Sequence, residues 1–362
     1  MTTVLTQPPV GDAAPCGPIE FELPADLEAP APPEARGLAR DEVRLMVSRV
    51  RDDRIEHGRF RDLPRFLAPG DVLVINTSGT INAALDARTS AGEAVELHRS
   101  TRLAPDEWVV ELRRRSPKGT APSFDGRAGE VIGLPAGGTA TLLAPYSRSA
   151  PARLWRARLR LPSVVRAYLA AHGFPIRYGY VRERWPLDYY QTVFATEAGS
   201  AEMPSAGRGF TPELITRLVA HGIEIVPVLL HAGVASLEAG EAPYPEYYRV
   251  EATSARRITA ARRDGRRIIA VGTTVVRTLE TVTAAGGVTH AGEGWTDVVV
   301  TTLRPVRGVD GIITGLHEPR ASHLLMLAAI AGCAHLRKTY EAALRERYLW
   351  HEFGDLHLIL PE

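Results

Sequence analysis

The chain has 362 residues, of which 45% are hydrophobic and 23% charged, and its 43 basic and 42 acidic side chains leave a formal net charge of +1. At roughly 150 residues per domain, this length predicts about two domains. This near balance of positive and negative charge excludes a polybasic protein and a protein with an acidic tail. It does not exclude a local basic patch, because net charge says nothing about how the charges are distributed.

The first part of the chain predicts a loose terminus followed by the beginning of a sheet. Residues 1–17 are rich in Pro, Gly, Ala and Thr, and we expect them to be flexible. Alternation over residues 44–51 predicts a strand, residues 60–67 resemble a short helix, and the apolar run 71–76 predicts a buried strand.

Residues 77–150 have a different sequence pattern, without a clear helical stretch. Short alternating segments are separated by turns of Gly, Pro, Ser and Asp, at residues 94–99, 107–113, 129–133 and 139–143. Regular short strands with such turns predict a small antiparallel β-barrel or sandwich, inserted into the rest of the chain.

Beyond residue 151 strands alternate with helices. Thr211 is a good N-cap with Pro212 at the first helical position, and Pro227 demands a bulge or an edge in its strand. The expected helices are 212–221, 254–264, 275–284 and 322–332, and the expected strands are 223–230, 267–271, 297–301 and 311–314. This alternation implies parallel pairing, so we expect an α/β fold whose mixed, largely parallel main domain (18–76 and 151–362) carries the inserted barrel domain 77–150.

Several common site types are missing from the sequence. It contains no P-loop, no Gly-x-Gly-x-x-Gly after a strand, no Gly-x-Ser-x-Gly elbow and no His-Glu-x-x-His, and its histidines show no metal-ligand spacing. The two cysteines, Cys16 and Cys333, are too few for a disulfide framework. The N-terminus lacks the basic start and apolar core typical of a signal peptide, and the longest apolar run near a helix, 324–331, is shorter than a membrane span. We therefore expect a cytoplasmic protein in a reducing compartment, without a metal, a cofactor or a membrane contact.

Polar residues follow three of the predicted strands, at 230–233, 271–280 and 314–319, and a fourth polar turn lies at 204–211. Ligands of open α/β sheets bind off the carboxyl ends of strands. His231 and His317 both follow apolar strands and are candidates for proton transfer near neutral pH. The alternative for each is a hydrogen-bonded structural histidine.

The turn Gly272-Thr273-Thr274 precedes a helix, where exposed amides and two hydroxyls suit an anion. Arg277 and Glu280 lie three residues apart on that helix and are placed to pair. A plain helix cap with a surface ion pair is the alternative. Aromatic and arginine residues between 177 and 190 suit either a nucleic-acid clamp or an aromatic loop packed on the barrel.

The order of motifs resembles the S-adenosylmethionine:tRNA ribosyltransferase-isomerase family of queuosine biosynthesis, over nearly the whole chain. The segments that carry the resemblance are 69–76, 190–195, 267–280, 294–297, 324–327 and 348–355. The family implies an α/β domain with an inserted barrel, and transfer of the ribosyl group of S-adenosylmethionine to the aminomethyl group of a 7-deazaguanine in tRNA. Adenine and methionine leave, and the ribose becomes an epoxycyclopentane.

The resemblance makes S-adenosylmethionine a substrate rather than a cofactor, tRNA a partner and the protein a monomer. By position, Thr273, Thr274 and Arg277 suit the anionic end of S-adenosylmethionine, while His231 and His317 are the candidate catalytic residues. The full set of candidate substrate-binding residues is Asn76, Tyr190, Gln191, Ser205, Gly207, Gly233, Gly272, Thr273, Thr274, Arg277, Glu280 and Thr314.

The sequence also departs from the family pattern in its loops. Residues 76–84 lack one carboxylate and two arginines of that pattern, the turn with Arg208 and Gly209 lacks a histidine, and residues 314–319 and the segment before Glu246 differ. Because these losses cluster in loops while the scaffold is kept, we hypothesise a divergent member. Three functions stay open: the tRNA enzyme, the same chemistry on another acceptor such as a free 7-deazapurine, and an inactive RNA- or nucleoside-binding protein.

Overall fold

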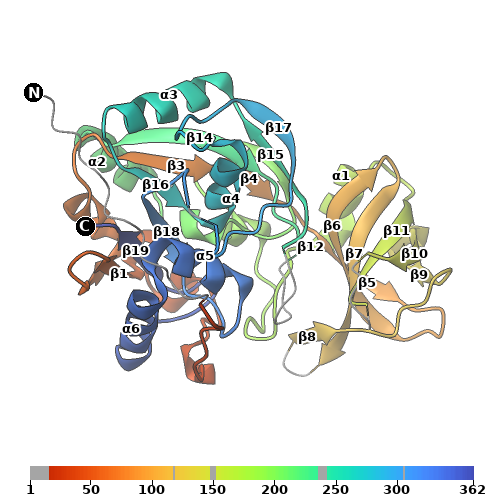
Figure 1. Ribbon diagram of the computed structural model, residues 1–362. Helices are drawn as coiled ribbons and strands as arrows, with labels where there is room; N and C mark the ends of the chain where they lie inside the picture. The colour runs from red at the N-terminus through yellow and green to blue at the C-terminus, as the bar shows by residue number, and fades with distance from the viewer. Residues whose placement is uncertain (1–15, 117–118, 147–151, 235–242, 305) are drawn as a thin grey trace, which may run out of the picture.

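The computed structural model describes residues 16–116, 119–146, 152–234, 243–304 and 306–362. The terminus expected to be flexible lies almost entirely outside the described residues, and so do residues 147–151 around the expected end of the barrel domain. The α/β unit and the barrel stand side by side (Figure 1).

A mixed sheet of nine strands within the described ranges forms the main unit, in the order β17-β15-β14-β3-β16-β18-β19-β1-β2. Its strands are β1 (Arg44–Arg49), β2 (Arg54–Arg59), β3 (Val72–Asn76), β14 (Glu224–Leu230), β15 (Glu246–Val250), β16 (Ile268–Val271), β17 (Gly292–Thr296), β18 (Gly311–Gly315) and β19 (Leu356–Leu360). The central strands β14, β3, β16 and β18 are parallel neighbours, which confirms the predicted mixed, largely parallel sheet. Pro227 pairs with β3 only, since β15 joins β14 at Leu229 and Leu230.

Helices cover both faces of this sheet (Figure 1). One face packs against α3 (Ala252–Arg263), α4 (Thr273–Val282), α5 (Ser322–Ala331) and α6 (Cys333–Arg345). The other packs against α2 (Pro212–Ala220) and the 3-10 helix η4 (Phe60–Phe66). Thr211 caps α2 as predicted, because its side chain accepts a hydrogen bond from the Leu214 amide. No helix in the described ranges has the length and apolar character needed to cross a membrane.

The second unit is a closed antiparallel barrel of six strands within the described ranges, as the insertion pattern predicts. Its strands are β5 (Ala84–Arg88), β6 (Ala94–Ala104), β7 (Glu107–Ser116), β9 (Val131–Gly133), β10 (Thr139–Pro145) and β11 (Leu154–Arg160), with β8 (Gly119–Pro122), β12 (Gly173–Phe174) and helix α1 (Val165–His172) attached. The pairing of β11 with β7 closes the ring. The barrel sheet therefore continues beyond residue 150, where the sequence analysis ended the domain.

A third, two-stranded sheet is formed by β4 (Ser78–Thr80), which pairs in parallel with β13 (Glu197–Ser200). The remaining elements are the 3-10 helices η1 (Ala25–Leu27), η2 (Pro33–Arg36), η3 (Arg40–Glu42), η5 (Pro135–Gly137), η6 (Leu187–Tyr190) and η7 (Ser205–Gly207).

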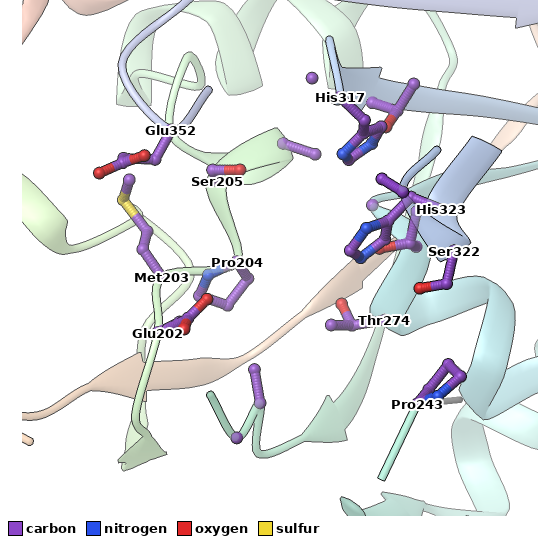
Figure 2. Close-up of a pocket in the computed structure, with 18 of the residues that line it drawn as sticks. Glu202, Met203, Pro204, Ser205, Pro243, Thr274, His317, Ser322, His323 and Glu352 are labelled. Carbon is purple, nitrogen blue, oxygen red and sulfur yellow. The ribbon is translucent and has the colours of Figure 1, made fainter. Parts of the chain in front are cut away.

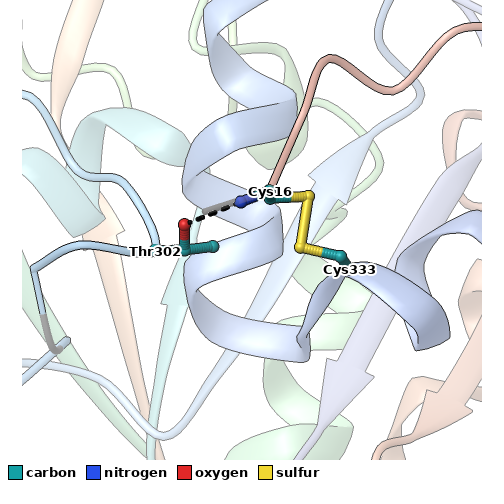
Figure 3. The surroundings of a disulfide bond; sticks show 3 residues. All are labelled: Cys16, Thr302 and Cys333. Atoms are coloured by element: carbon teal, nitrogen blue, oxygen red, sulfur yellow. Dashed lines mark hydrogen bonds between the residues drawn. A yellow bond between two sulfur atoms is a disulfide. The ribbon is translucent and has the colours of Figure 1, made fainter. Parts of the chain in front are cut away.

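Two features of the fold differ from what the sequence analysis described. Residues 297–301 form no strand, because the strand in this region is β17, which ends at Thr296 where its pairing with β15 ends. The two cysteines are bonded to each other: Cys16 joins Cys333 at the start of α6, and the Cys16 amide donates to Thr302 Oγ1 at 3.3 Å (Figure 3). One bridge between distant segments leaves no spacing pattern, so counting cysteines could not reveal it.

Candidate functional site

The main cavity lies at the carboxyl ends of the parallel strands, where open α/β sheets bind ligands. Three strand-end turns contribute to its wall: Gly233 after β14, residues 272–274 after β16, and residues 314–317 at the end of β18. The loop of Glu202, Met203, Pro204 and Ser205 faces His317, Ser322 and His323 across it (Figure 2).

The structure brings nine of the predicted site residues to this cavity and leaves five outside its lining. The lining residues are Tyr190, Ser205, Gly233, Gly272, Thr273, Thr274, Arg277, Thr314 and His317. Asn76, Gln191, Gly207, His231 and Glu280 lie outside.

His231 points away from the cavity, contrary to the sequence prediction. Its Nδ1 lies 2.7 Å from Ser78 Oγ, and its Nε2 lies 3.8 Å from Glu197. The ring lies so close over Gly199 that a Cβ added there would come within 2.4 Å of it. Burial lowers the pKa of His231. His231 therefore packs between β4, β13 and β14. The residues that follow it in the chain, and not His231 itself, line the cavity.

His317 lies in the cavity wall and is held from several sides. Its Nε2 is 2.8 Å from Thr314 Oγ1, and its amide donates to Tyr340 Oη at 3.2 Å. Its ring stacks on His323, with centroids 4.5 Å apart. Burial, together with the charge of His323, lowers the pKa of His317 well below 6.5, and burial lowers that of His323 to about 4. Both imidazoles are therefore neutral at pH 7 and retain a basic nitrogen.

Asn76 lies behind the turn at residues 272–274 and braces it. Its Nδ2 donates to the Leu230 carbonyl at 2.9 Å and to Thr274 Oγ1 at 3.3 Å. Its Oδ1 accepts hydrogen bonds from the amides of Ser78 and Leu230. Asn76 thus links the ends of β3 and β14 to the start of α4, and it positions Thr274 without lining the cavity itself.

Arg277 and Glu280 do not pair with each other, although the sequence analysis predicted this pair. The Arg277 guanidinium pairs with Glu246, and it donates to the carbonyls of Tyr244, Thr296 and Val298. Glu280 Oε1 instead accepts the amides of Arg307 and Gly308. These contacts use four of the five N–H groups of Arg277, so it fastens the cavity wall rather than offering a free fork for a carboxylate.

Two other predicted residues have structural contacts. The Gln191 side chain both donates to and accepts from the Thr80 backbone, and Gly207 is buried in η7. Tyr190 is 3% exposed, and its hydroxyl has no hydrogen-bond partner among the described residues.

The sequence analysis missed the acidic side of the cavity. Tyr180 Oη donates to Glu352 at 2.6 Å, Tyr178 donates to Glu202, and both carboxylates line the cavity. Burial raises the pKa of Glu352. The tyrosines of the aromatic segment therefore form a wall of this cavity. Glu352 follows no strand end; it lies in the segment 348–355 that carries the family resemblance, but the sequence analysis gave that residue no role.

A metal site is not apparent: the described ranges contain no group of three or more His, Cys, Asp or Glu residues arranged to hold an ion. The polar groups of the cavity are four carboxylates, of Glu202, Glu246, Glu318 and Glu352, together with the Arg277 guanidinium, imidazoles, hydroxyls and backbone amides. Such a lining suits a cationic or uncharged polar ligand and the movement of a proton.

Comparisons with known proteins identify relatives over almost the full length. A family profile described as queuosine biosynthesis protein matches residues 18–359. The S-adenosylmethionine:tRNA ribosyltransferase-isomerases of Moorella thermoacetica and Thermotoga maritima are 39% and 34% identical, each match covering 94% of this chain and 98% of the relative. The crystal structure of S-adenosylmethionine tRNA ribosyltransferase from Thermotoga maritima aligns with a TM-score of 0.52 and 29% identity, covering 94% of this chain and 99% of that one.

Proposed function

The chain belongs to the queuosine biosynthesis protein family, and on this premise we propose that it is an S-adenosylmethionine:tRNA ribosyltransferase-isomerase. It transfers the ribosyl group of S-adenosylmethionine to a 7-aminomethyl-7-deazaguanine base in tRNA and isomerises it to give epoxyqueuosine, with release of adenine and methionine. S-adenosylmethionine is a substrate, no further cofactor is needed, and we place this activity in the cytoplasm and in a monomer.

One observation supports this proposal most strongly: three strand-end turns converge with His317 on a single cavity that carries carboxylates. A sulfonium nucleoside is a cation, and buried carboxylates such as Glu352 favour it. The turn at residues 272–274, at the N-terminus of α4, suits the methionine carboxylate because a helix N-terminus carries partial positive charge.

The proposed chemistry starts with proton removal next to the sulfonium, which acidifies the C5′ hydrogens of the ribose. Loss of that proton leads to expulsion of adenine, and the acceptor amine then attacks the opened sugar. His317 is the candidate base, because it is neutral at pH 7 and lines the cavity, unlike His231. The Thr314 hydroxyl beside its Nε2 orients the ring. A base removes a proton effectively only from within hydrogen-bond reach.

A second candidate function, the same chemistry on a different acceptor, is supported by the packing at Gly209. The family pattern has a histidine there, but a Cβ at Gly209 would lie 2.8 Å from the Phe60 ring and 3.1 Å from Leu356. The neighbouring Arg208 turns inward to pair with Glu34 at 2.6 Å. This loop is therefore repacked without room for the histidine, and a changed loop beside the cavity alters acceptor selection more readily than it alters the scaffold.

Release of adenine separates these functions. The purified protein is incubated with S-adenosylmethionine and either 7-aminomethyl-7-deazaguanine tRNA, the same tRNA without the modification, or the free aminomethyl base. We expect adenine and methionine in equal amounts with the modified tRNA alone. Release with the free base would establish the second function, and no release with any acceptor would refute both.

A further inference from the structure

Arg99 on β6 is a buried cation without an acidic partner in the part of the chain that the structure describes. It is one of five buried arginines in the described ranges; the others are Arg113, Arg153, Arg208 and Arg277. Each of those four pairs with a glutamate, namely Glu111, Glu111, Glu34 and Glu246. Arg99 is 5% exposed, yet no carboxylate of the described residues lies within ion-pair distance of it.

The contacts of the Arg99 guanidinium do not replace such a partner. It lies over the Trp108 ring at 4.1 Å from the centroid, and its Nε is sealed from solvent without a hydrogen bond. A cation–π contact stabilises a buried charge far less than the removal of that charge from water, without a counter-charge, destabilises it. A second cation, Arg102, lies over the same ring at 5.4 Å and adds repulsion. This arrangement is favourable once an anion binds there.

The charge of the barrel segment points to the kind of anion. Residues 84–174 contain 14 basic and 8 acidic side chains, a net charge of +6, so the rest of the chain carries −5. Concentrated positive charge on one unit attracts a polyanion, and arginine forks match phosphate oxygens. A small carboxylate ligand would need positive charge only at its own binding site, not positive charge distributed over the whole barrel.

The Arg99 site also lies beside the cavity. The next residue, Ser100, accepts a hydrogen bond from the Val234 amide at 3.0 Å through its Oγ, and both Gly233 and Val234 line the cavity. A strand of RNA held at Arg99 would therefore have a neighbouring nucleotide at the cavity mouth.

We propose that Arg99 and Arg102, stacked on Trp108, form a phosphate-binding site for the backbone of an RNA substrate, and that this site holds the strand while one base enters the cavity. The choice of tRNA as the bound RNA rests on the proposed function, because tRNA is the substrate of that reaction. Phosphate contacts position a nucleic acid without reading its sequence, so this site acts on any tRNA, modified or not.

The test measures binding of unmodified tRNA as a function of KCl concentration. Arg99→Gln and Arg102→Gln each remove one charge, Arg99→Lys restores it, and Arg88→Gln is the matched control. Arg88 is an exposed arginine of the same barrel, whose guanidinium donates to the Gly92 carbonyl at 3.2 Å. Each phosphate contact contributes about 0.7–0.9 to the slope of log Kd against log salt.

We expect Arg99→Gln to weaken tRNA binding about tenfold at low salt and to reduce the slope by about 0.7–0.9, while Arg99→Lys and Arg88→Gln keep the slope of the wild type. The affinity for S-adenosylmethionine, measured by calorimetry, stays unchanged. Because Arg102 is exposed, Arg102→Gln reports on the site even if Arg99→Gln does not fold.

Unchanged slopes in both glutamine variants would overturn the proposal, and so would an equal loss in Arg88→Gln. A loss of S-adenosylmethionine affinity with tRNA binding intact would assign Arg99 to the nucleoside carboxylate instead. Since these measurements use unmodified tRNA and binding alone, they stay informative if the wild type releases no adenine, which would refute the proposed function separately.

Discussion

Replacing Arg277 by methionine removes the charge that holds two segments of the cavity wall together. The Arg277 side chain is 7% exposed and contacts Glu246 and three carbonyl oxygens of the segments 244–246 and 296–298. Methionine keeps much of the apolar volume of the arginine stem, but it leaves the largely buried Glu246 carboxylate without its counter-charge and the three carbonyl oxygens without their donor. The Gly233 amide still donates to Glu246 Oε1 at 2.7 Å.

The magnitude follows from these contacts. Breaking a buried ion pair by removing one partner costs about 3–5 kcal/mol, because an uncompensated charge stays inside. The carbonyl oxygens lose charge-assisted hydrogen bonds as well, but these losses overlap with the first. We therefore expect Arg277→Met to lower the free energy of unfolding by about 4 kcal/mol, a large share of a typical total of roughly 5–15 kcal/mol.

Urea unfolding followed by circular dichroism measures this loss. Arg263→Met is the control, since Arg263 is 79% exposed and its pairing with Asp264 contributes little. Adding Glu246→Gln to Arg277→Met should recover part of the loss, because the orphaned charge is then removed. A loss below about 1 kcal/mol, or no recovery in the double variant, would show that Arg277 does not fasten the wall.

Three further outcomes are expected. Thr273→Val should weaken S-adenosylmethionine binding about tenfold without lowering the melting temperature, and calorimetry that finds equal affinity would remove that turn from the site. Gly199→Ala should destabilise the fold by about 1–3 kcal/mol, because its Cβ would collide with the His231 ring; thermal unfolding checks this, and an unchanged melting temperature would contradict it. The pKa values of His317 and His323 are lowered in the folded state, so the unfolded chain takes up more protons below pH 6.5. Stability should fall by about 1.4 kcal/mol per histidine between pH 7.5 and 5.5, and urea unfolding in which His317→Asn shows the same pH dependence as the wild type would refute this.

Much of the fold was predictable because local patterns and tertiary packing agree. The cap at Thr211 and Pro212 starts α2 where expected, and the apolar run 71–76 became the buried strand β3. The strand predicted at 297–301 is absent. Its three valines resemble a strand in the sequence, but in the structure they line the cavity. Apolar composition alone does not distinguish a buried strand from a buried loop.

The candidate site was predictable only where chemistry follows a strand end. The rule that ligands bind at the carboxyl ends of parallel strands brought His317 and the turn at 272–274 to one cavity. The same rule misplaced His231, because position along a strand does not fix the direction of a side chain that can bond to Ser78. Glu352 and the unpaired Arg99 depend on contacts between distant segments, which no spacing in the sequence records.

The loop at Arg208 and Gly209 is one of the places where the sequence departs from the family pattern. The inward Arg208 pairs with Glu34 and also lies over the Phe353 ring at 5.1 Å from the centroid. The change therefore joins the loop to the segment that carries Glu352.

A crystal structure of the protein with S-adenosylmethionine tests most directly whether the strand ends form the nucleoside site. We expect density for the ligand inside the cavity, with its carboxylate at the turn 272–274 and its sulfonium side toward Glu352 and His317. Density for the nucleoside at any other place, such as the barrel surface, with this cavity holding only solvent, would contradict the account.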